Sequence, residues 1–239
     1  MENKLTLLGH ISELRYRLIV SLLVFCCSTA ISFPFSQVLL NILRSPASKF
    51  IEKFVYFSPE GALTVYLRLC FFSGFIISFP FISYQLWLFI SPAVTANFKK
   101  SVFLFTLFSL TAFLAGCLFA YFIFLPAALN FLFNIGKGVL VPVISANNYL
   151  SFVTTVILGC GIIFQLPVAI YILSIFGILS PAILRKNFKV AIIVMLIAAG
   201  IITPTTDIFN MLLFFLPMII LYEVSIWVSF LSRLKKEGK

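Results

Sequence analysis

The residues best suited to chemistry stand near the amino terminus, where His10, Glu13, Arg15 and Arg17 precede a long apolar run. Glu13 and Arg17 are four residues apart, which places both side chains on one face of a helix. Such a pair contributes about 0.3–0.5 kcal/mol. We interpret the segment as an amphipathic helix that leads into a membrane span with its carboxylate facing the cytoplasm. The alternative is an ordinary ion pair beside the membrane.

Enzyme chemistry is not expected from this sequence. It contains a single histidine, His10, and a single aspartate, Asp207, so it lacks an HExxH zinc motif and the aspartate pair of an intramembrane protease. It also lacks the GxSxG, GxxxxGK[ST] and GxGxxG motifs. We therefore predict no catalytic residue, no metal site and no cofactor.

A few polar residues interrupt the apolar spans. Arg68 and Glu223 each cost about 2.5–3.5 kcal/mol at the centre of a span unless they are paired, hydrated or near an interface. They are interpreted as a structural pair or snorkelling side chains, or else as contacts to a partner helix. Gln165 can hydrogen-bond between helices, a contribution of about 0.6 kcal/mol. Asp207, which follows Pro204 in a short outer turn, is expected to cap a helix and not to carry a proton.

The elements that position these residues are predicted to be membrane-spanning helices. Hydrophobic residues make up 62% of the chain, its mean hydropathy is +1.16, and its charges cluster between long uncharged stretches. About 20 apolar residues cross a bilayer as a helix, and uncharged runs of this length exclude a β-barrel. We predict an all-α integral membrane protein with one domain over 1–239 and six helices at Arg17–Leu40, Gly61–Phe89, Lys99–Leu125, Tyr149–Ile178, Pro181–Ile202 and Ile208–Phe230.

The distribution of positive charge predicts the topology. In a six-helix arrangement most basic residues fall on one side, so the positive-inside rule places both termini in the cytoplasm. The net charge of +10 is explained in this way and not by nucleic-acid binding, because the basic residues flank spans. The cytoplasmic set is Lys4, Arg15, Arg17, Lys99, Lys100, Arg185, Lys186, Lys189, Arg233, Lys235, Lys236 and Lys239, against Arg44, Lys49, Lys53 and Lys137 opposite.

Turn and proline signals refine this picture. Ser180 before Pro181 is expected to cap the fifth helix, and Asn147 and Asn148 are expected to cap the fourth. The fifth helix is short for a span, at about 25 Å of apolar length. Prolines in or beside the spans bend helices, so a curved, non-parallel bundle is predicted.

Residues 10–18, HISELRYRL, resemble the HLxELRxRL opening of the TatC family, the polytopic core of the twin-arginine protein translocase. The resemblance continues through most of the chain. It includes Ser58-Pro59-Glu60, the stretch FPFISYQLWLFISP at 79–92, Phe164-Gln165-Leu166-Pro167, Thr203-Pro204 with Asp207, and Pro217 followed by Tyr222-Glu223.

This resemblance implies a receptor for the twin-arginine signal peptides of folded cargo, which are exported by use of the proton motive force. By position, Glu13 would accept a guanidinium of the signal peptide, and Arg15, Arg17 and Phe89 would frame the site. TatA- and TatB-like single-span proteins and further copies of the chain are the implied partners, in a bacterial cytoplasmic membrane or, alternatively, a thylakoid or mitochondrial inner membrane.

The sequence departs from the family pattern at Phe98, which stands where a glutamate commonly precedes paired basic residues. A Phe98 ring could offer a cation–π contact of about 0.5–2 kcal/mol beside Asn97 carbonyl contacts. Gln165 likewise stands where the family often has glutamate, and we expect it to contact an inserted signal peptide or partner helix. A secondary transporter of a small solute and an assembly scaffold with altered cargo recognition remain the alternatives.

Overall fold

The computed structural model of the chain describes residues 7–48, 50, 54–56, 58–90, 98–135, 143–203 and 207–237. Within these ranges it describes the side chains of all residues except 7, 8, 98–101 and 231–237. Every regular element in the described part of the chain is helical, apart from one isolated β-bridge. The all-α fold predicted from the sequence is confirmed.

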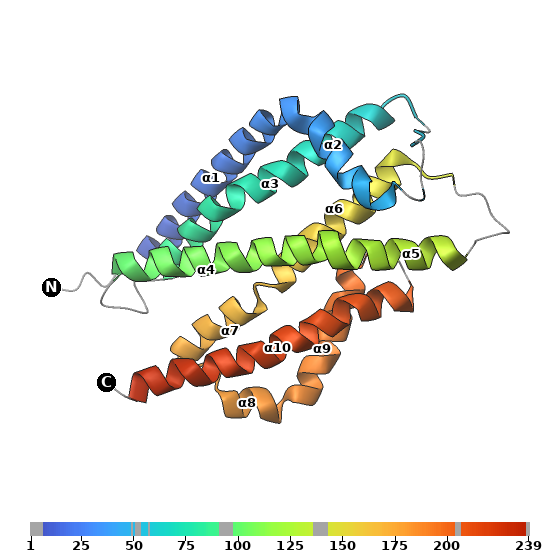
Figure 1. The fold of residues 1–239 in the computed structure, drawn as a ribbon. Helices are drawn as coiled ribbons and strands as arrows, with labels where there is room; N and C mark the ends of the chain where they lie inside the picture. Colours follow the sequence, from blue (N-terminus) through green and yellow to red (C-terminus); the bar gives the residue numbers. More distant parts are fainter. Residues whose placement is uncertain are drawn as a thin grey trace.

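The first half of the chain forms three long helical passages (Figure 1). The first passage is α1 (Leu7–Ser32) and α2 (Ser36–Arg44), joined by a 3-10 turn at Phe33–Phe35. The second is α3 (Gly61–Ile90). The third is α4 (Phe98–Phe119), a π-helical turn at Ala120–Phe124, and α5 (Leu125–Ile135).

The second half forms three more passages. The chain continues through α6 (Ala146–Ile163) and α7 (Leu166–Ile175), then α8 (Pro181–Lys186) and α9 (Phe188–Ile202), and finally α10 (Ile208–Glu237). Five helical stretches are long and apolar enough to cross a membrane, and the sixth, Phe188–Ile202, is a shorter apolar helix. The protein is therefore a multi-pass membrane protein, and its fifth helix is the short one, as predicted.

Both termini lie at the same end of the bundle, and the helices are tilted relative to one another (Figure 1). Prolines lie at one junction between helices and inside two helices. Pro34 lies in the 3-10 turn between α1 and α2, and Pro80 and Pro217 lie inside α3 and α10. The bundle is curved, in agreement with the prediction.

Several predicted helix boundaries are wrong. The first passage extends beyond Leu40 to Arg44, where Tyr121 Oη and Tyr149 Oη donate hydrogen bonds of 2.8 Å to the carbonyls of Ile42 and Leu43. These bonds satisfy carbonyls that have no partner within the helix. The passage also begins earlier than Arg17, because the amphipathic segment is itself part of α1.

The third passage continues ten residues past the predicted end at Leu125, although Pro126 follows. A proline lacks the amide hydrogen and its ring clashes with the preceding turn. The π-helical turn directly before it, in which the Leu125 amide donates to the Ala120 carbonyl, widens the helix at this point. The predicted fifth helix is divided instead, with a break at Asn187 between α8 and α9.

The helix-capping predictions divide into two confirmed and one wrong. Ser180 Oγ accepts a 3.1 Å hydrogen bond from the Ile183 amide, and Asp207 Oδ1 accepts one of 2.7 Å from the Asn210 amide. The asparagines do not cap the fourth passage, because α6 begins earlier, after Ser145.

At the start of α3, the pKa of the Glu60 carboxyl is lowered by its own backbone amide and by the Ser58 hydroxyl.

The apolar core joins the middle of most passages. Phe124, Phe214 and Val153 are completely buried, and the Phe124 and Phe214 rings lie 4.3 Å apart. A second small cluster, formed by Trp87, Val102 and Val168, lies at the carboxyl end of α3. Trp87 stacks on Phe105 with ring centroids 4.4 Å apart. This second cluster fixes the end of α3 against α4 and α7, close to the residues that the sequence singled out.

Candidate functional site

Glu13 is held on the first turns of α1 by Arg17. The guanidinium donates from Nε to Glu13 Oε1 at 3.1 Å, and its Nη2 donates to the same oxygen. Both side chains are largely sheltered, with 17% of Arg17 and 27% of Glu13 exposed. Charge-assisted hydrogen bonds of this kind are stronger than neutral ones. No hydrogen bond to Glu13 Oε2 is formed within the described residues, so the second carboxylate oxygen can accept a further donor.

Helix α3 completes this arrangement from the other side. Arg17 Nη1 donates a 3.2 Å hydrogen bond to Gln85 Oε1, which ties the first span to the second. One turn further along α3, the Phe89 ring stacks on His10 with centroids 4.4 Å apart and an interplanar angle of 24°. Glu13, Arg17 and Phe89, which the sequence assigned to one site, therefore lie together. Arg15 is exposed on α1 and forms no hydrogen bond or ion pair with them in the described part of the chain.

A groove of about 170 Å³ runs between α1 and α3 beside this cluster. Arg17, Gln85 and Phe89 contribute to its walls, and the remaining lining residues are Leu14, Leu18, Ser21, Ile82 and Leu86. A second hollow of about 280 Å³ shares Leu18, Ser21 and Ile82 with it and continues past Leu22, Phe25 and Phe75. The two hollows form one apolar path from the polar cluster toward the middle of the span.

The two helices approach each other closely at the far end of this path. A Cβ atom placed on Gly74 of α3 would lie 2.8 Å from the Thr29 Cα of α1, so only glycine fits there. The Phe25 ring of α1 also stacks on Phe71 of α3 at 6.2 Å. These contacts fix the spacing of α1 and α3, and with it the width of the groove.

Two of the expected site residues cannot be placed relative to Glu13. Asn97 lies outside the described residues. Phe98 is the first residue of α4, but its side chain lies outside the described part of the structure. Figure 1 shows the beginning of α4 at the same end of the bundle as the amino terminus.

Gln165 lies at the junction of α6 and α7, where Pro167 follows and the helix is interrupted. Its amide is engaged by a single residue of α4. Ser109 Oγ donates to Gln165 Oε1 at 2.7 Å, and Gln165 Nε2 donates to the Ser109 carbonyl at 3.0 Å. This pair of hydrogen bonds joins two spans, which is the structural role considered for Gln165.

Arg68 and Glu223 are not paired with each other. Within the described residues neither forms an ion pair, and Glu223 is exposed on α10, whereas Arg68 is half-buried on α3. Glu223 therefore presents a carboxylate on the outer surface of a span. At the outer turn, Asp207 caps α10 and also accepts a 2.8 Å hydrogen bond from Asn210 Nδ2 at Oδ2. Pro204 lies outside the described residues.

Sequence reasoning missed two polar residues of these clusters, Gln85 and Ser109. Gln85 interrupts an apolar stretch four residues before Phe89 and thus shares its helix face. That spacing is a usable signal. Ser109 carries no such signal, because serines are frequent in the spans and its partner lies 56 residues away in the sequence.

The chain matches the model of the family described as Sec-independent protein translocase protein (TatC) over residues 9–217. It is 36% identical to the Sec-independent protein translocase protein TatC of Aquifex aeolicus over 232 residues, covering 95% of this chain and 96% of that protein. It is 33% identical to the protein of the same name from Koribacter versatilis, covering 98% and 89% of the two chains.

A solved structure shares the fold. The crystal structure of a twin-arginine translocase receptor, TatC, superposes with a TM-score of 0.83 at 35% identity, covering 94% of this chain and 99% of that one. The family match over residues 9–217 includes the amino-terminal motif and ends within α10. The chain belongs to the TatC family of Sec-independent protein translocase proteins.

Proposed function

We propose that this translocase component is the receptor for twin-arginine signal peptides and that it binds them in the groove between α1 and α3. The observation that carries the proposal is that Arg17, which holds the Glu13 carboxylate, lines one end of an apolar path. Export signal peptides combine a basic amino-terminal region with an apolar region of 7–15 residues. The carboxylate would bind the basic region of the peptide, and the apolar groove beside it would bind the apolar region that follows.

The proposed contact uses the second oxygen of Glu13. Arg17 already occupies Oε1, so a guanidinium of the peptide would donate to Oε2. A charged hydrogen bond of this kind is worth about 1.5–3 kcal/mol. Arg17 holds the carboxylate in place through Gln85, and the Phe89 ring offers a face to a second cation, with Asn97, Phe98 and Arg15 framing the rest of the site.

The transport role is non-enzymatic, as expected for a family of protein translocases. We infer that folded cargo crosses by use of the proton motive force, in the cytoplasmic membrane of a bacterium and with both termini of this chain in the cytoplasm. The positive-inside distribution of basic residues supports this orientation.

The proposed partners are TatA- and TatB-like single-span proteins and further copies of this chain. Glu223 supports a partner contact, because a carboxylate exposed to lipid is costly and a polar group on a neighbouring helix would relieve that cost. Arg68 and Gln165 are weaker candidates for the same role, since Gln165 is already engaged by Ser109. Glu223→Leu is expected to reduce co-purification of a single-span partner, whereas Glu60→Leu is not.

Photo-crosslinking along α1 tests the groove directly. Leu18 lines both hollows and Ile19 beside it lines neither, although both side chains are exposed, at 63% and 47%. A photoreactive residue at 18 is expected to crosslink a twin-arginine peptide, and one at 19 is not. Equal crosslinking at both positions, or equal crosslinking of a twin-glutamine peptide at 18, would reject the groove as the binding site.

A further inference from the structure

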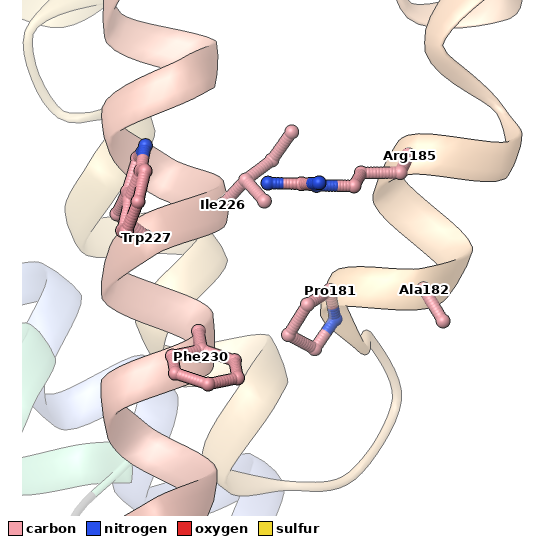
Figure 2. A pocket seen from close by; sticks show the side chains of 6 residues that line it. All are labelled: Pro181, Ala182, Arg185, Ile226, Trp227 and Phe230. Carbon is pink, nitrogen blue, oxygen red and sulfur yellow. The ribbon is translucent and has the colours of Figure 1, made fainter.

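A separate groove lies between α8 and the carboxyl-terminal half of α10, far along the chain from the amino-terminal site (Figure 2). Its volume is about 330 Å³. Pro181, Ala182 and Arg185 line it from α8, and Ile226, Trp227 and Phe230 line it from α10. Figure 2 shows the Arg185 guanidinium extending across the gap toward Ile226, while Pro181 and Phe230 face each other. The groove is therefore apolar apart from one cationic group.

A hydrogen bond and a ring contact hold α8 against α10 beside the groove. Tyr222 Oη donates a 2.9 Å hydrogen bond to the Leu184 carbonyl, and the Tyr222 and Phe188 rings lie 5.8 Å apart. Ser180 caps α8 at its start. These interactions hold α8 against α10 one turn away from Ile226, so the groove is part of the folded structure of this hairpin.

The charge of the groove is positive. Arg185 is exposed and forms no ion pair within the described residues. Lys186 and Lys189, which are also exposed, follow it along the chain. The acidic residue nearest on α10 is Glu223, which is likewise exposed and does not pair with Arg185. A guanidinium in this position donates its strongest hydrogen bonds to an anionic oxygen.

The position of the groove along the bundle matches a membrane interface. In Figure 1, α8 lies in the half of the bundle that holds both termini. Trp227 is 63% exposed, and tryptophan and arginine are both enriched where hydrocarbon meets the headgroups. Basic pockets between helices on the cytoplasmic side bind anionic lipid headgroups.

We infer that this groove binds an anionic glycerophospholipid. The phosphodiester lies at Arg185, and an acyl chain lies along Ile226 and Phe230 with Trp227 at the level of the glycerol. A protein helix without an acidic side chain at this position fits less well, because it would leave the Arg185 guanidinium without an anion.

Fluorescence quenching by brominated lipids tests this inference on the full chain in phosphatidylcholine vesicles. Trp227 faces lipid, whereas the second tryptophan, Trp87, is 3% exposed. Trp87→Phe leaves Trp227 as the sole reporter, and the unsubstituted chain gives a second reading if that variant folds poorly. Brominated phosphatidylglycerol is expected to bind about fivefold more tightly than brominated phosphatidylcholine, the effect of one cationic group near an anionic headgroup. Equal binding of the two lipids would overturn the inference.

Three further variants distinguish binding in this groove from a general effect of surface charge. Arg185→Gln is expected to abolish the preference, whereas Lys186→Gln, which removes the same charge from a residue that does not line the groove, is expected to preserve most of it. Equal losses in the two variants would overturn the site. Ala182→Phe, which fills the groove and keeps every charge, is expected to lower the preference, and an unchanged preference would place the lipid elsewhere.

Discussion

The guanidinium of Arg17 donates two hydrogen bonds to one oxygen of Glu13, one helical turn earlier on α1. The same guanidinium reaches Gln85 of α3, so the carboxylate is fixed relative to both helices that form the groove. In the proposed complex an incoming arginine would therefore meet a carboxylate that is already oriented and has one oxygen left to accept its donors. Pre-orientation of this kind lowers the entropic cost of binding.

Phe89 is predicted to contribute to peptide affinity through its aromatic face. Phe89→Leu removes the ring that stacks on His10 and lines the groove, and we expect a loss of about 2- to 30-fold, the range for a cation–π contact. Phe89→Tyr keeps the face and should bind nearly normally. The measurement is a titration of a fluorescent twin-arginine peptide against the purified chain. Equal affinities for the leucine and tyrosine variants would contradict a role for the ring.

Phe98 is predicted to limit affinity, because the family resemblance leads us to expect a glutamate at this position. Phe98→Glu at the first residue of α4 is expected to tighten peptide binding by about tenfold, the effect of one charged hydrogen bond. Phe98→Gln, which has a similar shape without the charge, serves as the matched control. If neither variant binds more tightly, the site does not use a second carboxylate, and recognition depends on Glu13 and its neighbours.

Gln165 is predicted to stabilise the bundle through Ser109. Gln165→Leu removes both hydrogen bonds between α4 and the α6–α7 junction, and we expect it to lower the free energy of unfolding by about 1–2 kcal/mol. Ser109→Ala, which removes only the hydroxyl, should cost about half as much. Unfolding in mixed micelles measures both. Unchanged stability of Gln165→Leu together with lost transport would instead assign the residue to peptide or partner binding.

Gly74 is predicted to set the spacing of α1 and α3. Gly74→Ala places a methyl group against the Thr29 backbone, and overpacking of this kind costs about 1–3 kcal/mol. Gly200→Ala is the matched control, because the only described atom near its added Cβ is Met211 Sδ at 3.9 Å. Thermal unfolding in detergent should show a lower Tm for the first variant alone. Equal Tm values would mean that the helix contact is less tight than the structure indicates.

Much of the fold was predictable because its signals are local in the sequence. Uncharged runs give the spans, and Ser180 and Asp207 mark helix starts through side chains that reach only three residues ahead. The errors arise where residues that are distant in the sequence determine where a helix ends. Tyr121 and Tyr149 extend the first passage by bonding to carbonyls more than 70 residues away, and the π-helical turn before Pro126 has no established sequence signature.

In the candidate site, too, the residues with a local sequence signal could be predicted and the contacts between distant residues could not. Glu13, Arg17 and Phe89 could be assigned from the amino-terminal motif and the family resemblance. The bond from Arg17 to Gln85 spans 68 residues of sequence, and the groove exists only because α1 and α3 pack side by side. The engagement of Gln165 by Ser109 was likewise not predictable, because it depends on the crossing of α4 and α6.

The most direct test of the central claim is a double-mutant cycle between Glu13 and the signal peptide. Affinities are measured for the unsubstituted chain and for Glu13→Gln, each with a twin-arginine peptide and with peptides in which either arginine is replaced by glutamine. A coupling energy of about 1.5–3 kcal/mol between Glu13 and one of the arginines is expected, the value of a charged hydrogen bond. Additive effects, with no coupling to either arginine, would contradict the account.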